Sequence, residues 1–179
     1  HSVRSTRQCV DAAKRDITIA TNLMETRLIC GDLVNHQKLV QATGPDHIWS
    51  SAEFYAGKLK EQRARHKKHD DTEYNLEPNV KDAPGGLRDV QLIDWTAKRH
   101  FNVSRRSQLV EKGVLLQHEY LKLYSDEEFL WRVRYGLHLI ANRAEERLLF
   151  DHQRKLALML GYEDVRGKLG VENFMQKYY

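Results

Sequence analysis

A short stretch of the chain combines two glycines with charged residues of both signs, a combination that could hold a phosphate. Gly85-Gly86 precedes a run in which apolar residues recur at helical spacing. The first turn of a helix has unpaired N–H groups and a partial positive charge, so an anion could approach the backbone closely at a glycine. Lys81 and Arg88 could add full positive charges. The candidate contact residues are therefore Lys81, Gly85, Gly86, Arg88 and Asp89.

The same stretch also allows a purely structural interpretation. The Pro-Gly-Gly sequence would then only turn the chain, while Asp89 offsets the positive end of the helix dipole by roughly 0.3–1 kcal/mol. The spacing fits neither a P-loop nor a dinucleotide-binding fingerprint. Glu77 and Asp82 would also repel an incoming phosphate. On the local sequence alone, the structural interpretation is favoured.

Two prolines determine how the candidate residues are presented. Pro78 and Pro84 each fix their own φ and lack a backbone donor, so residues 74–91 must begin as an extended segment. Apolar residues then recur at helical spacing from Leu87, and this pattern ends near Phe101. We therefore expect an extended loop, a tight turn and the start of a helix.

The rest of the sequence favours an all-α protein. Three prolines and ten glycines in 179 residues leave long uninterrupted stretches, which suit helices. Capping boxes at Ser5 and Ser50 begin helices that we expect to end at Gly31 and near Lys68. Asp16 could divide the first of these into two helices. The expected fold is a helical bundle with a long Pro/Gly loop between helices.

The last third of the chain contains the longest predicted helix. A separate short helix is expected over residues 115–124, followed by Asp126 as the N-cap of a helix whose apolar stripe continues to Leu148. Another helical pattern reaches the final two tyrosines, and position 1 is not a methionine. We therefore expect residues 1–179 to form a single helical domain that is a fragment of a larger multidomain protein.

The predicted helix before the loop ends in a strongly basic run. Residues 58–69 contain six Lys or Arg side chains and one acid, whereas the whole chain has a net charge of +4. Cations in the last turn of a helix favour its dipole and are usually just solvated. The alternative is a docking surface formed by Arg63, Arg65, Lys67 and Lys68. No aromatic residue interrupts the run, so we do not expect it to bind nucleic acid.

No group of residues in the sequence resembles a complete active site. His66 and His69 are three residues apart, but no cysteine or second histidine pair stands at ligand spacing. The sequence has no Gly-x-Ser-x-Gly elbow and no Asp-x-Asp pair for two-metal chemistry. We therefore expect no catalytic residue, no metal and no bound cofactor in this chain.

The sequence shows no sign of membrane insertion or export. Its apolar runs are only a few residues long, and no signal-peptide pattern follows the first residues. Cys9 and Cys30 both lie in predicted helices, outside any paired-ligand spacing, so we expect reduced thiols. These features favour a cytoplasmic protein with no membrane contact.

Several segments resemble one family of nitrogen-regulation enzymes. Asn-Leu-Glu-Pro-Asn-Val-Lys and then Pro-Gly-Gly-Leu-Arg-Asp-Val-Gln resemble the signature of the bifunctional uridylyltransferase/uridylyl-removing enzymes (GlnD), which modify the PII signalling protein. The resemblance covers nearly the whole chain. Its segments are residues 1–4, 75–81, 84–91, 129–134, 143–154 and 171–179. The Gly-Gly-x-Arg-Asp element is shared more distantly with glutamine synthetase adenylyltransferase.

The resemblance implies a fold and a setting for this chain. It implies a helical bundle, similar to the substrate-binding domains of nucleotidyltransferases, between an upstream nucleotidyltransferase domain and downstream hydrolase and glutamine-sensing ACT domains. In such an enzyme UMP passes from UTP, with Mg²⁺, to a tyrosine of PII, and a hydrolase reverses the transfer. The catalytic carboxylates belong to the upstream domain, so the fragment alone is expected to be inactive. One departure from the family pattern is Asp82-Ala83 before Pro84, where a glycine is expected.

Two functional hypotheses follow for the loop. In the first, it closes or scaffolds the nucleotidyltransferase site: Lys81 and Arg88 touch the triphosphate, and Asp89 holds Arg88. In the second, the chain is a purely structural interdomain or PII-docking module without direct nucleotide contact. Lys81 and Arg88 pointing into a cleft at the domain edge would favour the first hypothesis. Burial of Arg88 in a paired internal contact with Asp89 or another carboxylate would favour the second.

Overall fold

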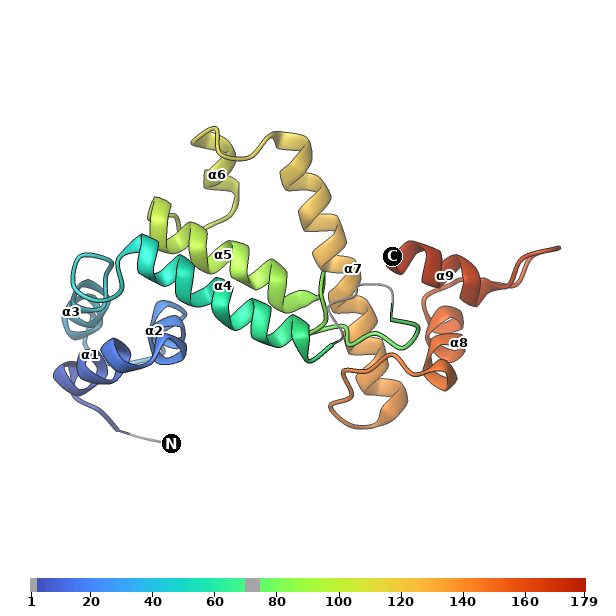
Figure 1. Cartoon of the computed structure of the whole chain (residues 1–179), viewed down its shortest axis with the longest axis horizontal. Coiled ribbons are helices and arrows are strands. Elements are labelled where there is room, and N and C mark those ends of the chain that lie inside the picture. The colour runs from blue at the N-terminus through green and yellow to red at the C-terminus, as the bar shows by residue number, and fades with distance from the viewer. Residues whose placement is uncertain (1–2, 70–74) are drawn as a thin grey trace. The chain divides into compact units, whose positions relative to one another are not determined.

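The computed structural model describes residues 3–69 and 75–179 (Figure 1). Tyr74, the first residue of the predicted loop stretch, lies outside the described residues, as do the first two residues of the chain. Within the described ranges the chain forms nine helices and no strand, apart from two isolated β-bridges. The predicted all-α fold is therefore confirmed.

The helices differ widely in length. In chain order they are α1 (Thr6–Arg15), α2 (Ile17–Met24), α3 (Leu33–Ala42), α4 (Ser51–Lys67), α5 (Leu87–Phe101), α6 (Ser107–Glu111), α7 (Gln117–Ala141), α8 (Phe150–Met159) and α9 (Gly170–Tyr178). The long Pro/Gly loop lies between α4 and α5, as predicted. Of the helices described, none is both long and apolar enough to cross a membrane.

The chain divides into two compact units. Unit 1 contains His1–Glu61 and Leu92–Val114, and unit 2 contains Gln62–Gln91 and Leu115–Tyr179. Helices α4 and α5 each contribute residues to both units. That residues 1–179 form a single domain stays a prediction.

Unit 1 contains both predicted capping boxes. Ser5 and Gln8 exchange hydrogen bonds at the start of α1, and Ser50 begins α4 in the same way. Asp16 accepts a hydrogen bond at 2.7 Å from the N–H of Thr18, so the first helix stops and α2 begins. The division at Asp16, which the sequence left open, is therefore confirmed.

Two features of unit 1 differ from the sequence prediction. Helix α2 ends at Met24, well before Gly31, and α3 is not among the predicted helices. Asp32 caps α3, because its carboxylate accepts from the N–H of Val34 at 2.8 Å. No residue of α3 is buried, so the helix lacks the strong apolar stripe on which prediction by periodicity depends.

A small apolar core holds unit 1 together. Ala13, Ala20 and Ile48 are buried, and Trp49 packs against them. The indole N–H of Trp49 also donates to the carbonyl of Ala13 at 2.7 Å. This contact joins α1 to the segment that leads into α4.

Unit 2 contains the longest helix, α7, which differs from its prediction at both ends. It begins at Gln117, so the short helix expected over residues 115–124 is part of it, and Asp126 is not an N-cap. Asp126 instead pairs with Lys122 one turn earlier, which stabilises it inside a helix. The helix also ends at Ala141, earlier than predicted.

The core of unit 2 is built from three helices and the loop. Leu130, Val133 and Leu137 of α7 pack with Leu156 of α8 and Phe174 of α9. Helix α8 packs against α7, and α9 packs against α8 (Figure 1). Because full burial of such a side chain contributes about 1.5–3 kcal/mol, this cluster is the main source of stability in the unit.

The loop between α4 and α5 enters the same core. Val80 and Leu87 are 0% and 1% exposed, and Leu148 lies with them in the cluster. Val80 of the loop and Leu87, the first residue of α5, are each followed directly by a candidate contact residue, Lys81 or Arg88. The apolar core therefore fixes the backbone from which both cations project.

Candidate functional site

The loop before α5 pairs with the segment between α7 and α8. The N–H of Val80 donates to the carbonyl of Glu146 at 2.9 Å, and the N–H of Leu148 donates to the carbonyl of Pro78 at 2.8 Å. An isolated antiparallel bridge lies between these two bonds. Two of the segments that show the family resemblance are therefore bound to each other.

Two polar side chains strengthen this pairing. Glu77 accepts from the N–H of Phe150 at 3.0 Å, which satisfies a donor in the first turn of α8. The other carboxylate oxygen of Glu77 lies 3.4 Å from the guanidinium of Arg147. Gln153 is 5% exposed and donates to one carbonyl of each segment, at 2.7 and 3.0 Å. Both side chains thus hold the loop in place.

The turn at the two glycines uses its own backbone donors. Gly86, Leu87 and Arg88 donate their N–H groups to carbonyls of the preceding loop at 2.9–3.0 Å. Gly85 donates to Asp89 Oδ2 at 2.9 Å, and the N–H of Asp89 bonds to the carbonyl of Gly86. Throughout residues 85–89, all of which the structure describes, no backbone N–H is left for an anion. Any contact between this turn and a phosphate must therefore come from side chains.

The two glycines have different structural roles. A Cβ atom at Gly86 would lie 2.8–2.9 Å from three backbone carbonyl oxygens, so the turn has no room for a side chain there. Gly85 has a φ of +75° and open space around its Cβ position. It is needed for its left-handed backbone conformation and not for close packing.

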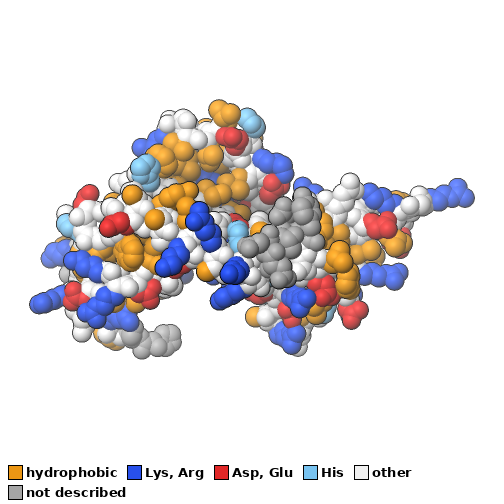
Figure 2. All heavy atoms as spheres, viewed as in Figure 1, with side chains coloured by type: hydrophobic (Ala, Val, Ile, Leu, Met, Phe, Trp, Pro, Cys, Tyr) orange, Lys and Arg blue, Asp and Glu red, His pale blue; other side chains and the backbone are white. Residues whose placement is uncertain are grey.

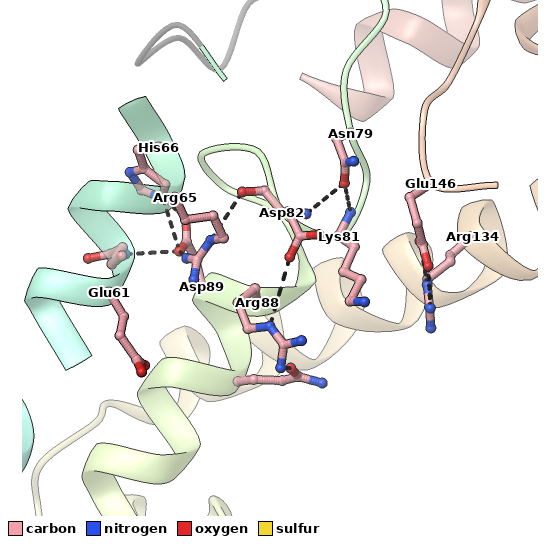
Figure 3. A network of polar contacts seen from close by, with 12 residues as sticks. Glu61, Arg65, His66, Asn79, Lys81, Asp82, Arg88, Asp89, Arg134 and Glu146 are labelled. Carbon is pink, nitrogen blue, oxygen red and sulfur yellow. Dashed lines mark hydrogen bonds and ion pairs between the residues drawn. The ribbon is translucent and has the colours of Figure 1, made fainter. Parts of the chain in front are cut away.

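Asp89 fastens the turn to the end of α4 (Figure 3). Its carboxylate accepts from Gln62 Nε2 at 2.9 Å, pairs with the guanidinium of Arg65 and lies 2.9 Å from His66 Nε2. A carboxylate oxygen accepts hydrogen bonds, so His66 Nε2 is the donor in this contact. Arg65 also donates its Nε–H to the carbonyl of Asp82 at 3.1 Å. Three side chains of α4 therefore hold both the loop and the first turn of α5.

Arg88 has other partners than the one expected. Its Nε lies 3.9 Å from Asp82 Oδ1, its NH1 donates to Gln91 at 2.9 Å, and its side chain is 33% exposed. Adjacent residues of a helix do not face each other, so Asp89 meets α4 while Arg88 points elsewhere (Figure 3). In the structure Asp89 holds Arg65 and His66 of α4, and the contacts of Arg88 include Asp82 and Gln91.

Lys81 lies between Arg88 and an ion pair that joins Arg134 of α7 to Glu146 of the segment after it (Figure 3). In that pair Arg134 donates to both carboxylate oxygens of Glu146, at 2.7 and 2.5 Å. These hydrogen bonds hold the pKa of Glu146 below its ordinary value, and the charge of Lys81 adds to the effect. The ammonium group of Lys81 makes no hydrogen bond or ion pair with the described residues. Lys81 is therefore held near a carboxylate without being tied to it.

The predicted docking surface loses one of its four members. Arg65 is half-buried in the network around Asp89 and is not available to a partner. Arg63, Lys67 and Lys68 are exposed. On the face shown in Figure 2, Lys and Arg side chains gather toward this end of α4.

Sequence reasoning missed the loop-holding role of four residues. They are Gln62, His66, Glu77 and Gln153. One signal was available, because Gln62, Arg65 and His66 have the i, i+3, i+4 spacing of one helix face. No local pattern relates Glu77 to Gln153, since their roles depend on contacts between distant segments.

The fold and the site together define a class of domain. Among the described residues, no group of three or more His, Cys, Asp or Glu side chains could hold a metal ion. Lys81 and Arg88 supply positive charge but neither a nucleophile nor a general base. The part of the chain that the structure describes is an all-helical fold that presents a fixed, charged turn before α5.

Comparison with known proteins identifies the family. The family model described as GlnD PII-uridylyltransferase matches residues 53–179, and the chain belongs to this family. The chain is similar to three curated relatives that are named bifunctional uridylyltransferase/uridylyl-removing enzyme. It is 56% identical to the protein from Pseudomonas aeruginosa (strain UCBPP-PA14), 53% to that from Stutzerimonas stutzeri (strain A1501) and 52% to that from Azotobacter vinelandii (strain DJ). Each match covers 99% of this chain and 20% of the relative. No solved structure matches the chain.

Proposed function

We propose that this chain is the helical domain of a bifunctional PII uridylyltransferase/uridylyl-removing enzyme, and that its loop closes one side of the nucleotidyltransferase site. A neighbouring domain of that enzyme transfers UMP from UTP, with Mg²⁺, to a tyrosine of PII, and a hydrolase domain removes it. The enzyme acts in the cytoplasm in nitrogen regulation and responds to glutamine. Support for this setting is the family membership together with the 20% share of the relatives that the chain covers.

One observation supports the role of the loop. Lys81 and Arg88 stay partly exposed, whereas the backbone N–H groups of the turn at residues 85–89 all donate hydrogen bonds within the chain. A preorganised loop loses little conformational entropy when its charges meet a ligand. Arg88 can make bidentate hydrogen bonds to a phosphate, and Lys81 can supply a point charge. In this proposal Gly85 and Gly86 shape the turn, and Asp89 anchors it without touching nucleotide.

Uridylyl transfer by the full-length enzyme with Arg88→Ala tests this role. We expect kcat/KM for UTP to fall about ten- to hundredfold, because a hydrogen bond to a charged group contributes about 1.5–3 kcal/mol. Removal of UMP from modified PII should not change. Arg63→Ala is the control, since it removes an exposed cation from the same unit. Unchanged UTP kinetics in Arg88→Ala would exclude the loop from the nucleotide site.

The second candidate is a purely structural interdomain or PII-docking module without nucleotide contact. Its support is the exposure of Arg63, Lys67 and Lys68 at the end of α4. In this case, replacing all three by Ala should raise KM for PII and leave KM for UTP unchanged. The effect should shrink at high ionic strength, because exposed charges are screened by salt.

A further inference from the structure

Unit 1 contains a cleft that the proposed role of the loop does not use. Its volume is about 590 Å³, and its lining comes from the ends of α2 and α3, the connection between α3 and α4, the end of α5, and the segment that follows as far as the start of α6. Small-molecule sites have volumes of about 300–1,000 Å³. Leu23, Val40 and Val103 supply apolar lining, and Asn102 and Gln108 contribute amide groups. The cleft thus has the size and the mixed lining of a ligand site.

Arg99 forms part of this lining and is only 3% exposed. Its guanidinium donates four hydrogen bonds: to the carbonyls of Thr43 (3.0 Å) and Gly44 (3.5 Å), and twice to that of Trp49 (2.9 and 2.6 Å). A guanidinium has five N–H donors, so one is left over. All the acceptors are neutral, and no carboxylate of the described residues forms an ion pair with Arg99.

The positive charge in the cleft is therefore incompletely neutralised. Burial lowers the pKa of Arg99, and the charge of Asp46, which is exposed, offsets this only in part. Lys98, the other Lys or Arg in the lining, is already paired with Glu25 at 2.5 Å. An anion that entered the cleft would meet an unpaired buried cation beside an apolar wall.

Arg99 also has a structural role that must be separated from ligand binding. Thr43 is the C-cap of α3, and a cation at this end of a helix favours the dipole. This role accounts for the bonds to the carbonyls of Thr43 and Gly44. It accounts neither for the fifth donor nor for the open volume beside it.

We propose that the cleft binds a small molecule in which a single acidic group, a carboxylate or a phosphate, is attached to an apolar body. Arg99 recognises the acidic group through its remaining N–H and its charge. Leu23, Val40 and Val103 contact the apolar body.

NMR titration of the 179-residue chain with three probes tests this proposal. Benzoate and phenyl phosphate have the required chemistry, and benzamide has the shape of benzoate without its charge. We expect saturable chemical-shift changes at Arg99 Nε–H and at the amides of Asn102 and Ser104 with at least one of the two acids. Benzamide should bind at least about tenfold more weakly than that acid. The better acid identifies the head group. Equal binding of benzoate and benzamide, or no saturable shift with either acid, would overturn the proposal.

Three variants separate ligand binding from folding. Ser104→Phe fills the cleft from an exposed position and should weaken binding of the better acid about tenfold or more, with thermal unfolding unchanged. Arg105→Gln removes an exposed cation that does not line the cleft and should bind normally. Arg99→Gln should lose both binding and stability. Normal binding by a folded Ser104→Phe variant would contradict the proposal.

Discussion

Asp89 is the residue on which the position of the loop depends most. Its side chain is 17% exposed, and its carboxylate meets three side chains of α4 and the N–H of Gly85 in the glycine turn. The side chain of Arg65 is 18% exposed, so it would keep a largely buried charge without a partner carboxylate if Asp89 were lost. Leaving a buried charged donor without its partner costs more than the pair itself contributes, so this site is sensitive to small changes.

Replacement of Asp89 by Asn should therefore destabilise the chain. We expect the free energy of unfolding in urea to fall by about 1–3 kcal/mol, because the charged hydrogen bonds to Arg65 and His66 are weakened. Asp126→Asn is the matched control: its partner Lys122 is exposed, and the loss should be at most about 0.5 kcal/mol. Equal losses in both variants would contradict the anchoring role.

The two glycines of the turn should respond differently to alanine. Gly86→Ala places a Cβ atom against three backbone oxygens, which cannot move without opening the loop, and should cost about 1–3 kcal/mol or more. Gly85→Ala meets no atom and should cost only about 1–2 kcal/mol, for its left-handed conformation. Urea unfolding measures both. A smaller loss for Gly86→Ala than for Gly85→Ala would argue against the close packing of the turn.

Glu146 should make stability depend on pH. Its pKa is lowered in the folded chain, chiefly by hydrogen bonds from Arg134, so its stabilisation is present above its ordinary value of 4.5 and lost as pH falls through the folded value. The difference in unfolding free energy between the wild type and Glu146→Gln should therefore be largest near neutral pH and shrink below pH 4.5. A difference that stays constant over this range would show that the carboxylate charge does not contribute.

At the scale of elements, α8 depends on a side chain from the distant loop. Glu77 accepts from the N–H of Phe150, the first residue of α8. A cap of this kind is worth about 1 kcal/mol, so Glu77→Ala should speed hydrogen exchange of the first-turn amides of α8 roughly fivefold. Glu128→Ala, which removes an exposed carboxylate of α7, is the control. Unchanged exchange in Glu77→Ala would exclude this cap.

The elements were predictable where local chemistry decides them. The capping boxes at Ser5 and Ser50 and the helix start at Leu87 follow from neighbouring residues, and the structure confirms all three. The prediction that Asp126 is an N-cap was wrong because an acidic residue can either cap a helix or form an ion pair inside one. Its ion pair with Lys122 places Asp126 inside α7. The apolar pattern of α3 is too weak to identify it.

At the scale of the whole molecule, the site was only partly predictable. Lys81 and Arg88 are close in sequence, so their placement on either side of the same glycine turn could be predicted. The bond between Arg65 and Asp89 could not, since it joins residues 24 positions apart and depends on how α4 meets the loop. For the same reason, the sequence could not show that Arg65, one of the four residues of the predicted docking surface, is engaged with Asp89 and Asp82.

The central claim, that the loop contacts nucleotide through side chains alone, is tested most directly by UTP binding. Calorimetric titration of UTP and Mg²⁺ would be made into the full-length enzyme and its Lys81→Ala/Arg88→Ala variant, with Arg63→Ala as the control. We predict that the double variant binds UTP at least about tenfold more weakly, because two charged contacts to the triphosphate are lost. UTP affinity equal to that of the wild type would contradict the claim and leave the loop a purely structural element.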